Sequence, residues 1–215
     1  MATRKLFGSL GSPDTMRALA SIYEHELHFD FVPIDLNAGH NETEAFLSLN
    51  PFGQVPVLQE DDFTLFESRA IMRYISHHYP KQGNEQVFEH PKLQGIAATW
   101  IDVEDHQFNP PASKLIRELV ENPKKGLAAD QEVVAEEEAK LAIVLDVYEE
   151  RLKDSKYLGG TKFSSADLTH LPNLYYILET PVKKLFDERP RVSAWCRDII
   201  SRPAWAKVVE MTREW

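Results

Sequence analysis

The first 80 residues alternate between short extended runs and stretches with helical spacing. Runs rich in aromatic and β-branched residues predict strands at residues 5–7, 29–34, 55–58 and 64–66. Apolar positions three and four apart predict helices between and after them, at residues 13–23, 43–49 and 67–79. A β-α-β unit followed by β-β-α predicts an α/β domain of the thioredoxin-like type, although the thioredoxin cysteines are missing.

Helical spacing also dominates the rest of the chain. Residues 81–90 are polar and aperiodic, and we interpret them as a linker. Beyond them, helices are expected at residues 91–108, 112–120, 128–152, 168–178, 191–200 and 204–211, and Asn109-Pro110-Pro111 should kink or break the first of these. The expected organisation is therefore a thioredoxin-like domain at 1–80, a linker at 81–90 and an all-helical domain at 91–215.

One later segment predicts a capped helix start. Ser164 is placed as the N-cap and Asp167 as the third helical residue of a capping box, with Phe163 and Leu168 as the hydrophobic staple. This pattern indicates a folding role, and loss of the Asp167 cap is expected to cost roughly 1 kcal/mol or more.

Composition narrows the class of protein. The chain is 43% hydrophobic and 27% charged, as in ordinary globular proteins, and its net charge is −10. There is no basic stripe, so nucleic acid is not an expected partner. There is no signal peptide and no apolar run near the roughly 20 residues of a membrane span, so a cytoplasmic protein without membrane contact is expected. The single cysteine, Cys196, is interpreted as a packed thiol.

Two short segments contain the residues that indicate a ligand-binding site. Residues 50–56, Asn-Pro-Phe-Gly-Gln-Val-Pro, predict a turn that leads into a strand whose proline leaves a backbone edge free to pair with an extended peptide. Residues 65–71, Leu-Phe-Glu-Ser-Arg-Ala-Ile, place Glu67 and Ser68 at a helix start, where the backbone N–H groups favour an anion. Together they indicate a site for a small acidic peptide.

These segments resemble the glutathione transferases, and in detail their phi class from plants. Further similar stretches lie at residues 8–12, 144–152, 166–172 and 202–205, so the resemblance covers essentially the whole chain. It implies a thioredoxin-like N-terminal domain, an all-helical C-terminal domain and a homodimer. Glutathione would be a co-substrate, and no tightly bound cofactor or metal is expected.

The resemblance points to Ser12 as the catalytic group. Ser12 stands where phi-class enzymes carry the serine that donates a hydrogen bond to the glutathione sulfur. Phe7 occupies the position of the tyrosine that many animal relatives use, and no cysteine lies at the first helix start. Two alternatives stay open on the residues alone: Ser12 could be a simple N-cap, and Ser9 is a nearby rival hydroxyl.

The same resemblance assigns the rest of the peptide site. Val55 would pair its backbone with the cysteinyl unit, next to a cis bond at Pro56. Glu67 would bind the γ-glutamyl ammonium, and Ser68 would bind the carboxylate through its hydroxyl and backbone N–H. Gln54 would also contact the peptide. For Glu67 and Ser68 the alternative is ordinary helix capping.

One departure affects the glycyl end of the peptide. Phi-class enzymes usually carry His-Lys in the loop before the short helix, whereas the matching positions here are Asn41 and Glu42, with His40 one residue earlier. A small shift of the loop would let His40 replace them; otherwise glutathione is held more weakly.

The electrophile is expected to bind between the two domains. Candidate walls, each with core packing as the alternative, are Leu10, Leu36, Phe108, Leu115 and Leu119.

The resulting expectation is a detoxifying enzyme of the serine type. It would add the glutathione thiolate to hydrophobic electrophiles and could also reduce organic hydroperoxides. The alternative function is a non-catalytic carrier of flavonoids, hormones or other apolar compounds.

Overall fold

The computed structural model describes residues 4–80 and 90–213, which fall into two units. The first unit contains residues 4–80 and 203–213, and the second contains residues 90–202. The linker expected at residues 81–90 lies almost wholly outside the described residues. Across the described ranges, no helix is both long and apolar enough to cross a bilayer.

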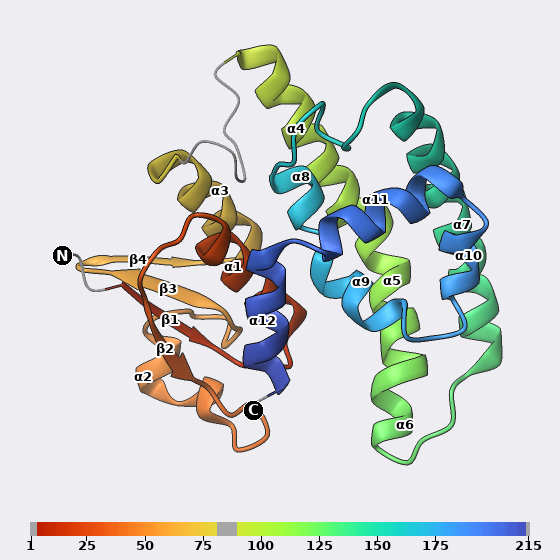
Figure 1. Ribbon diagram of the computed structural model, residues 1–215. Helices are drawn as coiled ribbons and strands as arrows, with labels where there is room; N and C mark the ends of the chain where they lie inside the picture. The colour runs from red at the N-terminus through yellow and green to blue at the C-terminus, as the bar shows by residue number, and fades with distance from the viewer. Residues whose placement is uncertain (1–3, 81–89, 214–215) are drawn as a thin grey trace. The chain divides into compact units, whose positions relative to one another are not determined.

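A four-stranded sheet forms the centre of the first unit (Figure 1). Its strands are β1 (Arg4–Gly8), β2 (Asp30–Pro33), β3 (Val57–Glu60) and β4 (Phe63–Phe66). They lie in the order β2-β1-β3-β4, with β1 parallel to β2 and antiparallel to β3, and β3 antiparallel to β4. The expected thioredoxin-like arrangement is confirmed, because the β-α-β unit gives the parallel pair and the hairpin gives the antiparallel pair.

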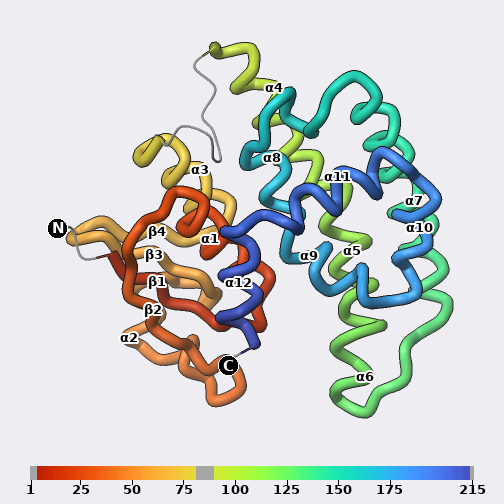
Figure 2. Tube along the Cα trace, viewed as in Figure 1, coloured from red at the N-terminus to blue at the C-terminus, as the bar shows by residue number. Residues whose placement is uncertain are grey.

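Three helices lie together beside this sheet (Figure 2). They are α1 (Pro13–Glu24), α3 (Ser68–His78) and α12 (Pro203–Arg213), and α1 contacts both others. A short helix, α2 (Glu44–Leu47), follows a single 3-10 turn, η1 (His40–Glu42). Gly8 lets α1 begin close to the end of β1, because a Cβ there would lie 2.5 Å from the Cγ2 atom of Thr15.

The last helix, α12, is part of the first unit, together with the sheet. From the sequence it was expected in the helical domain at residues 91–215. Trp205 and Val208 of α12 are buried, and the Tyr23 hydroxyl of α1 lies 3.6 Å from the sulfur of Met211. The apolar face of α12 therefore packs on α1. Helical periodicity showed that this face is buried, but it did not show against which partner.

The second unit is helical throughout. Its α-helices are α4 (Pro91–Val103), α5 (Asn109–Ile116), α6 (Asn122–Lys124), α7 (Gln131–Asp154), α8 (Ser165–Leu168), α9 (Leu171–Ile177), α10 (Lys183–Asp187) and α11 (Pro190–Ile200). The short helix α10 was not predicted. Cys196 is buried in α11, and burial raises the pKa of its thiol, as expected for a packing residue.

The expected break at Asn109-Pro110-Pro111 takes the form of a π-helical turn. Glu104–Phe108 and Arg117–Glu121 are π-helical, and they connect α4, α5 and α6 into one continuous helical path. Proline cannot donate a backbone hydrogen bond, so the two prolines lie at the start of α5, directly after the wider turn.

The predicted capping box is present at the start of α8. Ser164 is the N-cap, and the Asp167 side chain returns to the Ser164 backbone N–H at 3.1 Å. Asp167 is fully buried and its carboxylate also accepts hydrogen bonds from the Leu158 backbone N–H and the Trp195 indole N–H, both at 2.9 Å. The carboxylate therefore ties the preceding loop and α11 to this helix start, which the sequence did not indicate.

Candidate active site

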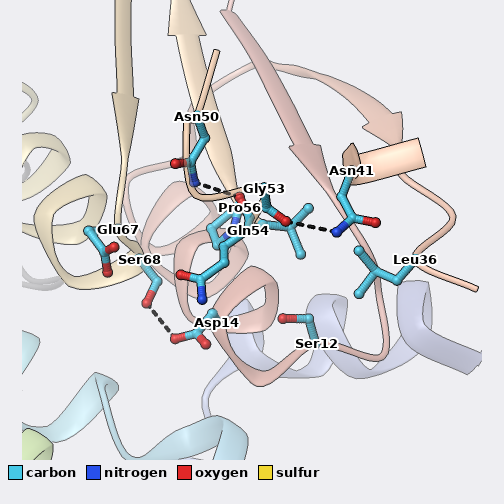
Figure 3. A pocket seen from close by; sticks show the side chains of 11 residues that line it. Ser12, Asp14, Leu36, Asn41, Asn50, Gly53, Gln54, Pro56, Glu67 and Ser68 are labelled. Carbon is cyan, nitrogen blue, oxygen red and sulfur yellow. Dashed lines mark hydrogen bonds between the residues drawn. The ribbon is translucent and has the colours of Figure 1, made fainter. Parts of the chain in front are cut away.

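A pocket of about 350 Å³ opens on the first unit. It is formed by the start of α1, the segment from the end of β2 through η1, the turn before β3 and the start of α3. Of the eight residues proposed to bind or activate the peptide, seven line this pocket: Ser12, Asn41, Gln54, Val55, Pro56, Glu67 and Ser68. Figure 3 shows Glu67 and Ser68 at one end, Asn41 and Leu36 at the other, and Gln54, Asp14 and Ser12 between them.

Ser12 is the N-cap of α1 and also faces this pocket. Its Oγ accepts a hydrogen bond from the Thr15 backbone N–H at 3.4 Å, and Pro13 occupies the first helical position. A serine hydroxyl has one proton to donate besides its two lone pairs. The cap uses only a lone pair, and no acceptor among the described residues takes the proton. Ser12 can therefore cap α1 and donate a hydrogen bond to a ligand at the same time. The rival hydroxyl, Ser9, does not line the pocket.

Asn50 fixes the turn that carries the peptide-pairing edge. Its side chain is buried, its Nδ2 donates to the Gln54 carbonyl at 2.8 Å, and its Oδ1 accepts from the Phe52 N–H at 3.1 Å. Gly53 has φ +61° and would bring a Cβ to 3.1 Å from the Asn41 carbonyl, so the turn requires glycine. Neither residue was among the predicted site residues, although both stand in the quoted motif.

The predicted cis bond between Val55 and Pro56 is confirmed. The strand β3 begins at Val57, directly after Pro56, where the ladder with Phe7 of β1 and Phe66 of β4 starts. No hydrogen bond from the described residues occupies the backbone of Val55, so its peptide groups are open to an extended ligand.

Glu67 precedes α3 in an unusual backbone conformation. Its φ is +70°, a value that non-glycine residues rarely adopt. Its side chain is exposed and makes no capping hydrogen bond to the helix, so ordinary capping does not explain this residue. Such strain is concentrated at functional positions in proteins.

Ser68 is held by two charged residues of α1. Its hydroxyl donates to Oδ1 of Asp14 at 2.7 Å, and its Oγ accepts from Nη1 of the buried Arg17 at 2.9 Å. The same Arg17 nitrogen forms an ion pair with Asp14. Burial would raise the pKa of Asp14, but Arg17, Ser68 and Arg69 outweigh it and the pKa is lowered, so Asp14 is an anion at neutral pH. Sequence reasoning missed Asp14, because its role depends on a residue 54 positions away.

The glycyl end of the pocket lacks a cation among the residues that line it. Asn41 donates through Nδ2 to the Gly53 carbonyl at 2.8 Å, which ties the two loops together. His40 and Glu42 are exposed in the turn η1, and neither lines the pocket. The shift that would let His40 replace the missing cation is not seen in this structure.

The five candidate walls of the electrophile site lie in different environments. Leu36 lines the pocket, whereas Leu10 is buried in the first unit. Phe108 and Leu115 are fully buried in the second unit, where Phe108 stacks on Tyr148. Their packing gives Phe108 and Leu115 a core role, and Leu119 is partly exposed.

Comparison with known proteins agrees with this geometry. The family model for the glutathione S-transferase N-terminal domain matches residues 2–77, and the model for the C-terminal domain matches residues 108–203. A glutathione S-transferase from Hyoscyamus muticus is 52% identical over 206 residues, which cover 96% of this chain and 97% of the relative.

Two solved structures are also similar. Glutathione transferase F7 from Populus trichocarpa has a TM-score of 0.91 and 42% identity, covering 97% of this chain and 98% of that one. Glutathione S-transferase I from maize, in complex with an atrazine glutathione conjugate, has a TM-score of 0.90 and 33% identity, with 99% of each chain covered.

A thioredoxin-like sheet with this pocket, followed by a helical unit, defines a glutathione transferase, and the chain belongs to that family. Within the family it belongs to the plant phi class, to which the F-type relatives belong.

Proposed function

We propose that this enzyme is a serine-type transferase, in which Ser12 donates a hydrogen bond to the glutathione sulfur and the thiolate then attacks a hydrophobic electrophile. The observation that carries this proposal is the Ser12 hydroxyl, which caps α1 through a lone pair and keeps its proton for a ligand in the pocket. The maize relative, whose structure holds a glutathione conjugate, supports the reaction class.

The chemistry needs a thiolate at neutral pH. A free cysteinyl thiol has a pKa near ~8.5, so only a few per cent is ionised at pH 7. A hydroxyl donor and the N-terminus of α1 both stabilise the anion and lower that pKa. The thiol proton goes to solvent, the sulfur forms a bond to the electrophilic carbon, and the leaving group departs with its electron pair. Ser12 keeps its own proton throughout.

The pocket also suggests how the tripeptide is oriented. The γ-glutamyl end would lie at Glu67 and Ser68, the cysteinyl unit would pair with Val55 near Ser12, and the glycyl end would lie near Asn41. Figure 3 shows Gln54 between Ser68 and Ser12. In this orientation the sulfur reaches the start of α1.

Titration of the bound thiol tests the proposal. The ultraviolet absorbance of the thiolate, followed against pH in the enzyme–glutathione complex, should show a pKa below that of free glutathione by at least about one unit. A bound thiol that titrates as it does in water would overturn the catalytic role of Ser12.

Restoring a cation at the glycyl end should strengthen glutathione binding. Glu42→Lys replaces a negative side chain with a positive one near Asn41, and the Michaelis constant for glutathione should fall roughly two- to fivefold, as expected for an exposed ion pair. Glu44→Lys makes the same change of charge in α2, outside the pocket, and serves as the control. If the two variants have equal Michaelis constants, the missing cation does not limit binding.

A carrier function is the second candidate, because the glycyl end of the pocket lacks the usual cation. In that case apolar compounds such as flavonoids or hormones would bind without being turned over. Measuring displacement of a bound fluorescent dye together with turnover separates the two, since a carrier binds these compounds but does not conjugate them.

Three further proposals rest on the resemblance to the phi class. They are a role in detoxification, reduction of organic hydroperoxides by the same thiolate, and a homodimer in the cytoplasm. Equilibrium sedimentation would measure the oligomeric state, and a coupled glutathione reductase assay would measure peroxidase activity.

A further inference from the structure

We propose that Asp14 is a specificity-determining residue of the peptide pocket, whose carboxylate accepts the free ammonium group of the γ-glutamyl unit. This inference rests on the proposed function, because it assumes that glutathione occupies the pocket. It adds a residue of α1 to the γ-glutamyl end, where Glu67 alone had been expected to bind the ammonium group.

Asp14 is placed to touch a ligand. It lines the pocket together with Ser12 and Ser68, and Figure 3 shows it between those two residues. Its side chain is 51% exposed, although Arg17 beside it is only 1% exposed. The carboxylate is therefore supported from the protein side and open on the pocket side.

The hydrogen bonds of Asp14 fall on one of its two oxygens. Arg17 Nη1 and the Ser68 hydroxyl both donate to Oδ1. Within the described ranges no donor is bound to Oδ2. A carboxylate oxygen accepts about two hydrogen bonds, so Oδ2 keeps its full capacity for a donor from the ligand.

The same contacts limit the hydrogen bonds that the Ser68 hydroxyl can make to a ligand. Its only hydroxyl proton is donated to Asp14, and its oxygen accepts from Arg17. The Ser68 hydroxyl therefore has no proton left for the ligand's α-carboxylate, which would depend on the backbone N–H groups at the start of α3. An ammonium group has three protons and needs several acceptors, and the carboxylates of Asp14 and Glu67 provide them.

A purely structural role would have a different consequence. Asp14 is an acidic residue in the first turn of α1 and pairs with Arg17 three residues later, which by itself stabilises a helix. In that case removing its charge would affect every ligand of the pocket equally. Direct contact predicts an effect only on ligands that carry the amine.

The experiment therefore combines a variant with a modified ligand. Asp14→Asn keeps the shape and an acceptor oxygen for Ser68 while removing the charge. Dissociation constants are measured by calorimetry for glutathione and for glutaryl-cysteinyl-glycine, which lacks only the γ-glutamyl amine. The wild type should prefer glutathione by at least tenfold, and Asp14→Asn should reduce that preference by roughly tenfold, as for a hydrogen bond between charged groups. The matched control Glu44→Gln, in the first turn of α2, should leave the preference unchanged.

Two results would overturn the role of Asp14: an equal weakening of both peptides in Asp14→Asn, or no change in either. A crystal of the wild type with glutathione gives a second measurement that does not need the variant to fold. It should place the ligand nitrogen about 3 Å from Oδ2, and a nitrogen beyond hydrogen-bond reach contradicts the inference. If the wild type conjugates glutathione but does not prefer it over glutaryl-cysteinyl-glycine, this inference alone is overturned. If the wild type does not bind glutathione at all, the proposed function is overturned as well.

Discussion

Ser12→Ala should lower kcat/KM for conjugation of glutathione to an electrophilic aromatic chloride by roughly 100-fold, the loss typical of one preorganised hydrogen-bond donor. The pKa of the bound thiol should rise toward its value in water, so the loss should shrink as the assay pH increases. Stopped-flow absorbance of the conjugate measures the rate, and titration of the complex measures the pKa.

Two controls separate donation from capping. Ser9→Ala removes the neighbouring hydroxyl, which does not line the pocket, and should change kcat/KM little. Ser12→Thr keeps both the cap and a donor and should retain most of the activity, whereas loss of the cap alone costs only about 1 kcal/mol of stability. If Ser9→Ala abolishes turnover while Ser12→Ala keeps it, the donor is Ser9.

Asp167→Ala should have the largest effect on stability. The free energy of unfolding should fall by about 3 kcal/mol, because the buried N–H groups of Leu158, Ser164 and Trp195 all lose their acceptor. This is more than the loss of a cap alone, which was the expectation from the sequence. Urea unfolding followed by tryptophan fluorescence measures the change.

Asp130→Ala is the matched control, since Asp130 caps α7 from an exposed position and its side chain accepts from the Glu132 and Val133 backbone N–H groups. Its replacement should cost about 1 kcal/mol. Equal costs for the two variants would contradict a special role for the buried carboxylate.

The pH dependence gives a further check on Asp167. Burial raises the pKa of its carboxyl to about 6, above the value of about 4 expected in the unfolded chain. The folded state then holds the proton more tightly, so the stability that Asp167 contributes is greatest below pH 4 and decreases as the pH rises through 6. The difference between the wild type and Asp167→Ala should therefore be larger at pH 5 than at pH 8.

The fold of the first 80 residues was largely predictable because each element has a local signal. Alternating runs identified the strands, Pro13 marked the start of α1, and the element order fixed the sheet topology. The partner of α12 was not predictable, since an apolar helix face does not reveal what covers it. The π-helical turn at Glu104–Phe108 was also missed, because a proline pair predicts a disturbance without its geometry.

Some residues of the candidate site were predictable from short motifs, and others were not. Pro56, Glu67 and Ser68 stand in short segments whose spacing carries the information, and they meet in one pocket. Asp14 had no such signal: its acidic side chain at a helix start is what any N-terminal turn favours. The fold brings Ser68 to Asp14 from 54 residues away, and together with Arg17, one turn further along α1, it uses only Oδ1.

The position of α12 determines how the first unit could be produced without the second. The sheet and its pocket are encoded near the beginning of the chain, but Trp205 and Val208, which belong to the same core, are encoded at its end. A fragment that stops after α3 would leave the side of α1 that packs on α12 open to water, so it should aggregate when made alone. A circular permutant that joins the last helix directly to the first strand would keep the whole module on one continuous polypeptide.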